Sequence, residues 1–217
     1  MDKPIANSQI ETIMSMLEEA MIILRDDKQR PKNDLVFGNI RKIQKSVFSD
    51  YGDEYSFDND KIPLADITFH TVDDPLNYSD DRSSVALVPS DFTLRFYRSI
   101  AGITPEMIAK RLDLADYWID PDGQRTPNHM NIRVPPNLAQ HSYRYRANAH
   151  ANSRFPVDVE VFYIDSSLDA PQGSLAKLDR IKIRRAYPLV TAEDRERMRE
   201  EKEQRIRELY GKPEAGK

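Results

Sequence analysis

Residues 157–164 read VDVEVFYI, a run of β-branched and aromatic residues that predicts a strand. Two other stretches in the same part of the chain have strand character. Residues 142–148 alternate tyrosine with arginine, and residues 177–186 hold isoleucines between basic flanks. Three consecutive strands pair most simply as an antiparallel meander, so this part of the sequence predicts a small sheet.

The N-terminal part of the chain has helical periodicity in two places. Ser8 and Glu11 form a capping-box pattern, and apolar residues then recur at three- and four-residue spacing as far as Leu24. The apolar stripe of this helix fits either core packing or a helical dimer seam. A second helix is expected over residues 34–50, and the two would form an antiparallel hairpin. The apolar positions of the second helix are Val36, Ile40, Ile43 and Val47.

Short elements are expected between this hairpin and the meander. Strands are predicted over residues 64–72 and 84–88. Ser90 is a suitable N-cap for a short helix ending at Gly102, although the same residues alternate equally well on a strand. Thr104 and Pro105 begin another helix, and residues 121–136 are expected to form a long loop. The inner face of that helix is predicted to contain Met107, Ile108, Leu112 and Ala115.

The C-terminal part of the chain predicts a charged helix. Thr191 and Asp194 form another capping box, and the helix runs to Tyr210 with Glu–Arg pairs at i,i+4 spacing. The predicted fold is therefore α+β: an N-terminal helical hairpin, then two short helices packed on a small antiparallel meander, with a charged C-terminal helix. The chain is predicted to divide into three parts: an N-terminal helical region with an acidic segment (1–89), an α+β domain (90–187), and a charged C-terminal helix and tail (188–217).

The order of elements between residues 90 and 187 resembles the SmpA/BamE-like family, which shares the general layout of the β-lactamase inhibitor protein. The shared features are the Gly102-Ile103-Thr104 helix start, the helix that ends near Leu112, and the three strands after a long loop. This resemblance implies a bacterial, non-catalytic protein-binding module, usually of the cell envelope. Asp113 departs from the pattern, because that family usually has glycine there.

The composition excludes several classes of protein. The 217 residues include no cysteine, which excludes disulfides and thiolate zinc sites. The seven glycines form no phosphate-binding loop, and no HExxH or GxSxG motif is present, so the sequence predicts neither an enzyme nor a cofactor. No run approaches the ~18 apolar residues of a membrane span, and residues 1–7 lack signal-peptide character. A cytoplasmic location is expected, with the bacterial periplasm as the alternative if a signal peptide was removed.

The sequence also predicts no metal site. Its four histidines have no spacing that places two ligands on one metal. These are His70, His129, His141 and His150. Residues 58–60 begin like a calcium loop, but the glycine and the glutamate that such a loop requires are missing.

The segment between Asp50 and Asp81 is the main candidate for function. It holds ten acids against one base, a charge of −9, together with aromatic residues. Charge accelerates encounter with a partner and buried aromatic side chains supply affinity. We therefore predict a protein-binding module, such as a bacterial immunity or inhibitor protein, that recognises a basic protein partner. The predicted contact residues are Tyr51, Asp53, Glu54, Tyr55, Phe57, Asp58, Asp60 and Tyr78.

The predicted meander supports an alternative function. The run Arg180-Ile181-Lys182-Ile183-Arg184-Arg185, with Arg144 and Arg146 from a neighbouring strand, would form a basic face beside Tyr143, Tyr145 and Tyr187. Basic and aromatic side chains interleaved on a sheet are typical of single-stranded nucleic-acid binding. The same residues also fit an ordinary solvated sheet face.

Overall fold

The computed structural model describes residues 5–28, 36–45, 52–62, 64–73, 86–134, 138–164, 176–186 and 191–210. The helices in these ranges are α1 (Asn7–Asp26), α2 (Pro105–Arg111) and α3 (Ala192–Tyr210). The strands are β1 (Asn39–Lys45), β2 (Asp53–Asp58), β3 (Ala65–Asp73), β4 (Leu87–Ile100), β5 (Leu114–Ala115), β6 (Tyr117–Ile119), β7 (Arg125–Pro127), β8 (His129–Val134), β9 (Leu138–Ala147), β10 (Val157–Ile164) and β11 (Lys177–Arg185).

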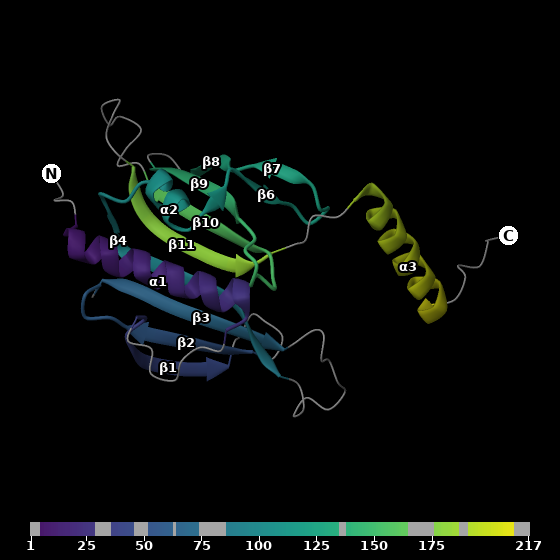
Figure 1. Ribbon diagram of the computed structural model, residues 1–217, viewed down its shortest axis with the longest axis horizontal. Coiled ribbons are helices and arrows are strands. Elements are labelled where there is room, and N and C mark those ends of the chain that lie inside the picture. Colours follow the sequence, from purple (N-terminus) through teal and green to yellow (C-terminus); the bar gives the residue numbers. More distant parts are fainter. Residues whose placement is uncertain are drawn as a thin grey trace.

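One antiparallel sheet joins nine of these strands. Its order is β1-β2-β3-β4-β11-β10-β9-β5, and β8 also pairs with β9. β11 follows the other strands along the described chain but lies in the interior of the sheet, between β4 and β10 (Figure 1). β6 and β7 form a separate two-stranded ribbon. β1 therefore lies at one end of the sheet and is paired on one side by β2.

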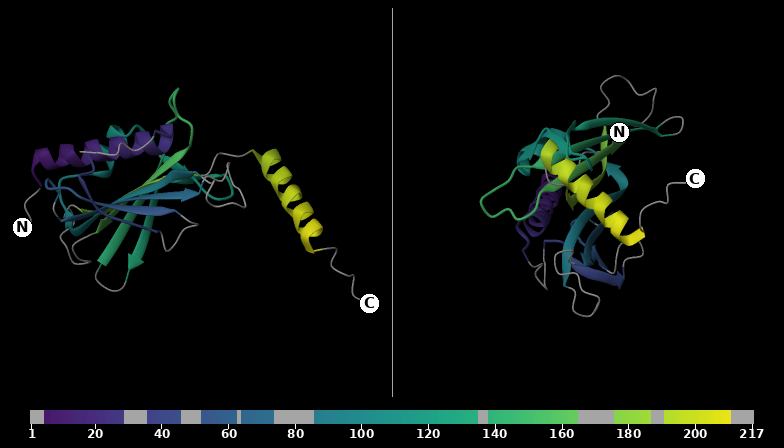
Figure 2. Two further views of the ribbon diagram at one scale, coloured as in Figure 1. Left: turned by 90° about the horizontal axis from the view of Figure 1, so that it is seen from below. Right: turned by 90° about the vertical axis from the view of Figure 1, so that its right-hand side faces the viewer.

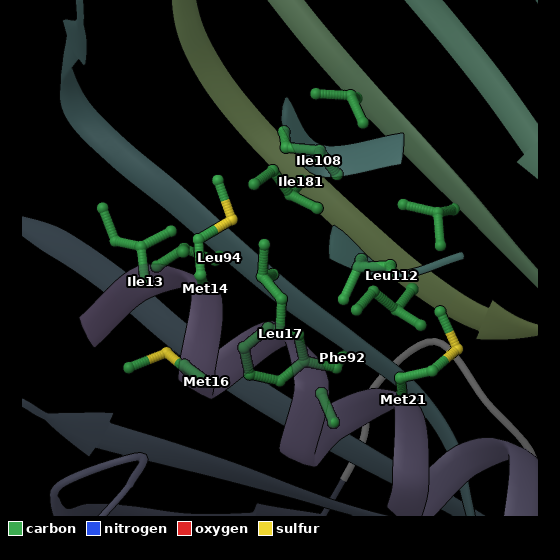
Figure 3. Packing of buried hydrophobic residues seen from close by; sticks show 14 of the residues in the cluster. Ile13, Met14, Met16, Leu17, Met21, Phe92, Leu94, Ile108, Leu112 and Ile181 are labelled. Atoms are coloured by element: carbon green, nitrogen blue, oxygen red, sulfur yellow. The ribbon is translucent and has the colours of Figure 1, made fainter. Parts of the chain in front are cut away.

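α1 lies across one face of the sheet, and α3 stands apart from it (Figure 2). Eight residues of α1 are buried, at the helical spacing of its apolar stripe. Figure 3 shows this stripe packed with Phe92 and Leu94 of β4 and Ile181 of β11. Core packing of α1 is thus confirmed, and the stripe that also fitted a dimer seam is covered by the chain's own sheet.

The start of α1 differs from the predicted capping box. The helix begins at Asn7, so Ser8 lies within its first turn and is not the N-cap. The side chain of Gln9 instead accepts a hydrogen bond from the backbone N–H of Ala6, at 3.3 Å. This bond satisfies one of the backbone donors that a helix start leaves unpaired.

The end of α1 is held by residues distant in the sequence. The carbonyl of Arg25 accepts hydrogen bonds from the backbone N–H groups of Arg154 and Phe155, at 2.8 and 3.0 Å. Arg185 of β11 donates to the carbonyl of Leu24 at 3.1 Å and also to the carboxylate of Asp27. The last carbonyls of the helix are therefore satisfied by β11 and by the segment before β10.

The predicted helix over residues 34–50 is wrong. The described part of this stretch is a turn at Val36 and Phe37 followed by β1. The register between β1 and β2 shifts between Ile40 and Lys42, which places an extra residue, Arg41, in β1. Because of this bulge, Ile40 and Ile43 share one face of a strand although they are three residues apart. Their spacing therefore mimicked a helix.

The predicted short helix at Ser90 is also wrong, because these residues form part of the 14-residue strand β4. β4 pairs with β3 on one side and β11 on the other. Phe92, Leu94 and Phe96 alternate toward the core and are all buried. The apolar residues of this segment fit both the two-residue alternation of a strand and the four-residue spacing of a helix, so the sequence alone could not distinguish them. Pairing with a strand on each side favours the extended conformation.

The predicted long loop over residues 121–136 contains two strands, β7 and β8. The side chain of Asp120 accepts hydrogen bonds from the N–H groups of Asp122 and Gln124, at 3.0 and 2.8 Å, and so forms the turn between β6 and β7. In the preceding helix α2, Ile108 and Leu112 are buried as predicted. Met107 is exposed and does not belong to the inner face.

The meander and two helices were predicted correctly. β9, β10 and β11 pair in sequence order. Thr104 caps α2 by accepting from the N–H of Met107 at 3.3 Å, and Thr191 caps α3 by accepting from the N–H of Asp194 at 3.1 Å. However, the meander belongs to a much larger sheet. The predicted helical hairpin on a small meander was therefore wrong: the chain is α+β, with a single long N-terminal helix on a large antiparallel sheet.

The large sheet crosses one of the predicted domain boundaries. The boundary between residues 89 and 90 falls inside β4, and the sheet contains strands from both sides of it. The short helix that contributed to the SmpA/BamE-like resemblance is the second part of this strand. Among the described helices, none combines the length and apolar character needed to span a membrane.

Candidate functional site

The outer edge of the sheet is formed by β1, which Phe37 anchors to the core. The Phe37 side chain is fully buried, and its ring centroid lies 5.6, 5.9 and 5.4 Å from those of Phe57, Phe69 and Phe92. Gly38 follows with a φ of 105°, where a Cβ atom would lie 2.1 Å from the carbonyl oxygen of Asp58. Glycine is therefore required at this turn, which directs the chain from the core into the edge strand.

β1 presents apolar side chains that its own fold does not cover. Ile40 lies opposite the buried Phe57, and Ile43 lies opposite Tyr55, so both isoleucines are on the α1 side of the sheet. Nevertheless, Ile40 is 42% exposed and Ile43 is 55% exposed. Within the part of the chain that the structure describes, β1 pairs with β2 alone. An unpaired backbone edge and two exposed β-branched side chains are thus combined in one strand.

The charged residues of β1 are all basic. Arg41 contacts Asp58 at 3.4 Å and Asp66 at 3.0 Å, and Lys45 contacts Asp53 at 2.8 Å. A hydrogen bond with Tyr97, followed by one with Asp66, raises the pKa of Arg41. The hydrogen bond with Asp53 raises the pKa of Lys45. These cations stay charged at neutral pH.

Lys42 differs from the other cations of this strand. It lies opposite Ser56, on the face of the sheet that α1 does not cover. Its side chain is exposed, and none of the described carboxylates forms an ion pair with it. Lys42 is therefore the cation of β1 that a second chain could pair with without displacing a described carboxylate.

The acidic residues predicted to contact a partner lie beside this edge, mostly in β2. Asp53 and Asp58 bind Lys45 and Arg41, and Glu54 binds Gln44 at 2.9 Å and His70 at 3.1 Å. Asp60 is exposed in the turn after β2. The structure thus brings these acids together, but cations of the same chain neutralise much of their charge.

The predicted aromatic anchors are placed less favourably. Phe57 is fully buried in the core, so its prediction as a surface anchor is wrong. Tyr55 is half-buried and packs against the core. Tyr51 and Tyr78 lie outside the described residues. The sequence showed that these residues are aromatic, but it did not show which face of a strand each one occupies.

His70 of β3 is clamped between carboxylates on the two neighbouring strands. Its Nδ1 lies 3.0 Å from Oδ1 of Asp91, and its Nε2 lies 3.1 Å from Oε2 of Glu54. The hydrogen bond with Asp91 is the main cause that raises the pKa of His70, against the opposing effect of burial. Burial would raise the pKa of Asp91, but His70 and the nearby Lys182 lower it. Both ring nitrogens are occupied, so this histidine joins three strands and offers no free nitrogen to a substrate.

The arrangement predicted for nucleic-acid binding is divided between two faces. The rings of Tyr143 and Tyr145 are stacked, with their centroids 6.5 Å apart. Both side chains pack with the core on the α1 side of the sheet. Arg144 and Arg146 lie on the other face and pair with Glu160 and Asp158, each at 2.6 Å. The tyrosines therefore do not lie beside the arginines, and both arginines are paired. Tyr187 lies outside the described residues.

The residues of the calcium-like stretch have structural partners. Asp58 contacts Arg41, and the side chain of Asn59 donates to the carbonyl of Val36 at 3.2 Å and accepts from the N–H of Lys61 at 3.0 Å. Asn59 thereby joins the turn before β1 to the turn after β2. Among the described residues, no three histidine or acidic side chains are grouped so that they could hold a metal ion.

Comparison with known proteins identifies no relative. No family model matches the sequence, and neither a curated protein nor a solved structure matches it. The edge strand β1 was not predicted from the sequence, although the isoleucines and basic residues directly after Gly38 could have indicated it.

Proposed function

We propose that the chain is a non-catalytic protein-binding module that captures an extended, acidic segment of another protein along β1. The observation that carries this proposal is the outer edge of β1, where Ile40 and Ile43 are exposed beside Lys42. A segment added to this edge would form main-chain hydrogen bonds with it, and alternate side chains would provide specificity. Its apolar side chains would cover the two isoleucines, and its acidic side chains would face Lys42 and Arg41.

The charge of β1 favours an acidic partner over the basic partner predicted from the sequence. Arg41, Lys42 and Lys45 are basic, and residues 39–45 contain no acid. The acids of β2, by contrast, are paired with cations of the same chain. A basic partner would have to displace those cations before it could reach the carboxylates. An acidic segment reaches Lys42 without breaking an ion pair.

The same charge argues against a second copy of the chain as the partner. Two β1 strands paired edge to edge would bring six cations together, three from each copy. Like charges directly opposite each other destabilise paired strands, and edge lysines and bulges are features that prevent self-pairing. The basic residues of β1 therefore disfavour pairing between two copies of the chain, but they do not disfavour pairing with an acidic strand. An immunity or inhibitor protein acts by binding its target, so binding of an acidic segment at β1 would be sufficient for such a role.

The proposal can be tested with synthetic peptides. The probe is a fluorescein-labelled peptide of about eight residues that alternates valine with glutamate, because strands in sheets are usually about 3–10 residues long. Its matched control alternates valine with lysine. We expect fluorescence anisotropy to show binding of the glutamate peptide, weakened by added salt, and at least about tenfold weaker binding of the lysine peptide.

Two variants locate the binding. Lys42→Glu should lower affinity for the glutamate peptide by about tenfold, because an attraction becomes a repulsion. Lys110→Glu makes the same charge change on an exposed residue of α2 and should leave affinity unchanged. Equal affinities of these two variants, or no preference between the two peptides, would rule out recognition at β1.

A further inference from the structure

A pocket of about 540 Å³ lies beside the start of α1, apart from the β1 edge. Its apolar wall contains Ile5, Ile62, Leu64, Phe96 and Ile100. Ile62 and Phe96 are buried, whereas Leu64 is 58% exposed, so the wall runs from the core to the surface. The volume lies within the range of about 300–1,000 Å³ that is typical of small-molecule sites.

A large bulge in β4 creates this pocket. Arg95 pairs with Arg180 and Ile100 pairs with Leu178, so residues 96–99 of β4 lie opposite the single residue Asp179 of β11. The N–H of Tyr97 donates to the carbonyl of Leu64 at 2.9 Å. A bulge of this kind interrupts the ladder and redirects side chains, and bulges occur often beside functional sites. Here the bulge separates β4 from β11 next to Phe96.

The polar side of the pocket is positively charged. Arg98 and Lys177 both line it, from the neighbouring strands β4 and β11. Arg98 is exposed, and none of the described carboxylates pairs with it. Gln9 places the first turn of α1 at the pocket, and a helix start adds a partial positive charge. No acidic side chain among the described residues lines the pocket, although the whole chain carries a net charge of −4.

We propose that this pocket binds a single-chain amphiphile with an apolar tail and a carboxylate head, the chemistry of a free fatty acid. The tail lies along the wall formed by Ile62, Leu64 and Phe96. The head binds Arg98, whose guanidinium matches a carboxylate with two parallel hydrogen bonds. This activity is separate from protein binding at β1, since the two sites share no residue.

The test is calorimetric titration of the full chain with dodecanoate below its critical micelle concentration. We expect one molecule to bind per chain. Dodecanol, which has the same tail and no charge, should bind at least about tenfold more weakly, because the ion pair with Arg98 is lost. Decanoate should bind roughly fifteenfold more weakly than dodecanoate, since each buried methylene changes affinity about fourfold.

Matched variants on one strand separate the pocket from general charge effects. Arg98→Gln should lower dodecanoate affinity about tenfold, because it removes the ion pair with the head group. Arg95→Gln removes the same charge from an exposed residue of β4 outside the pocket and should keep affinity within about twofold. Unchanged urea midpoints would show that both variants are folded.

Three results would overturn the proposal: no heat of binding with dodecanoate, equal binding of dodecanol, or equal effects of the two arginine variants. None of these results depends on the peptide experiment, because Lys42 and Ile43 lie in neither the pocket nor β4.

Discussion

β10 and β1 belong to the same sheet and have similar lengths, but their surroundings differ completely. β10 has strands on both sides and is buried at every position except its last residue. β1 has one neighbour among the described strands and is exposed at six of its seven positions. The interior strand therefore contributes to the core, and the edge strand is the one at which we propose recognition. This difference predicts that equivalent substitutions will have very unequal effects in the two regions.

The largest effect is expected where β1 is anchored to the core. Phe37→Ala should lower the free energy of unfolding by about 4 kcal/mol, because it empties the centre of the aromatic cluster with Phe57, Phe69 and Phe92. Ile43→Ala, on the exposed strand, should change it by less than about 0.5 kcal/mol. Urea denaturation measures both values. Similar losses in the two variants would mean that Ile43 is covered in the folded chain.

The two ends of the sheet also differ in their ion pairs. Arg146 and Asp158, of β9 and β10, are both buried, and burial raises the pKa of Asp158 although Arg146 opposes this shift. Arg146→Met should cost about 3 kcal/mol at neutral pH, because it leaves Asp158 buried and unpaired.

The exposed pair of Lys45 and Asp53 provides the matched comparison. Lys45→Met should cost much less than Arg146→Met, since a solvated ion pair contributes little. Urea unfolding of both variants under one set of conditions tests this contrast. Equal costs would contradict the burial difference between the two pairs.

An effect smaller than those of Phe37→Ala and Arg146→Met depends on pH and arises at β3, between these two regions of the sheet. His70 has a folded pKa above its ordinary value of 6.5, so its clamp stabilises the fold fully below that value and is lost as pH rises through the raised pKa. At about pH 6, His70→Gln should cost about 1–2 kcal/mol, because a charged group loses its hydrogen bonds.

Urea unfolding of His70→Gln and wild type at several pH values measures this contribution. The difference between the two proteins should shrink as pH rises through the raised pKa of the histidine. The pKa of Asp91 is instead lowered from its ordinary value of 3.8. Asp91 therefore contributes fully to the stability of the fold above pH 3.8, and this contribution is lost as pH falls through the lowered pKa. A constant difference between the two proteins from pH 6 to pH 9 would contradict the clamp.

Local patterns predicted the parts of the fold that depend on local interactions. The periodicity of α1, the Thr104 cap and the β-branched run of β10 each determine one element within a few residues. The order of the sheet is not local, since β4 pairs with β11 about 80 residues later along the chain. Nothing in the spacing of Phe92, Leu94 and Phe96 could decide between helix and strand until β3 and β11 were present on either side.

The candidate site was predicted only in part, for a related reason. The sequence located the charged segment but could not show which cations would neutralise it, because Arg41 and Lys45 reach Asp58 and Asp53 across a strand pair that was not expected. The exposed isoleucines were assigned to a helix because a one-residue bulge in β1 changed their spacing. Both errors follow from missing a single strand.

The interior position of β11 has a consequence for synthesis of the protein. As the chain leaves the ribosome, β1 to β4 and then β9 and β10 emerge as two separate groups, and within the sheet β11 is the strand that pairs with both groups. Until then the end of α1 also lacks Arg185, and its apolar stripe faces an incomplete surface. Contacts this distant in sequence form late, and exposed apolar surface in a nascent chain favours aggregation and chaperone binding. The protein should therefore depend on chaperones until β11 has been translated.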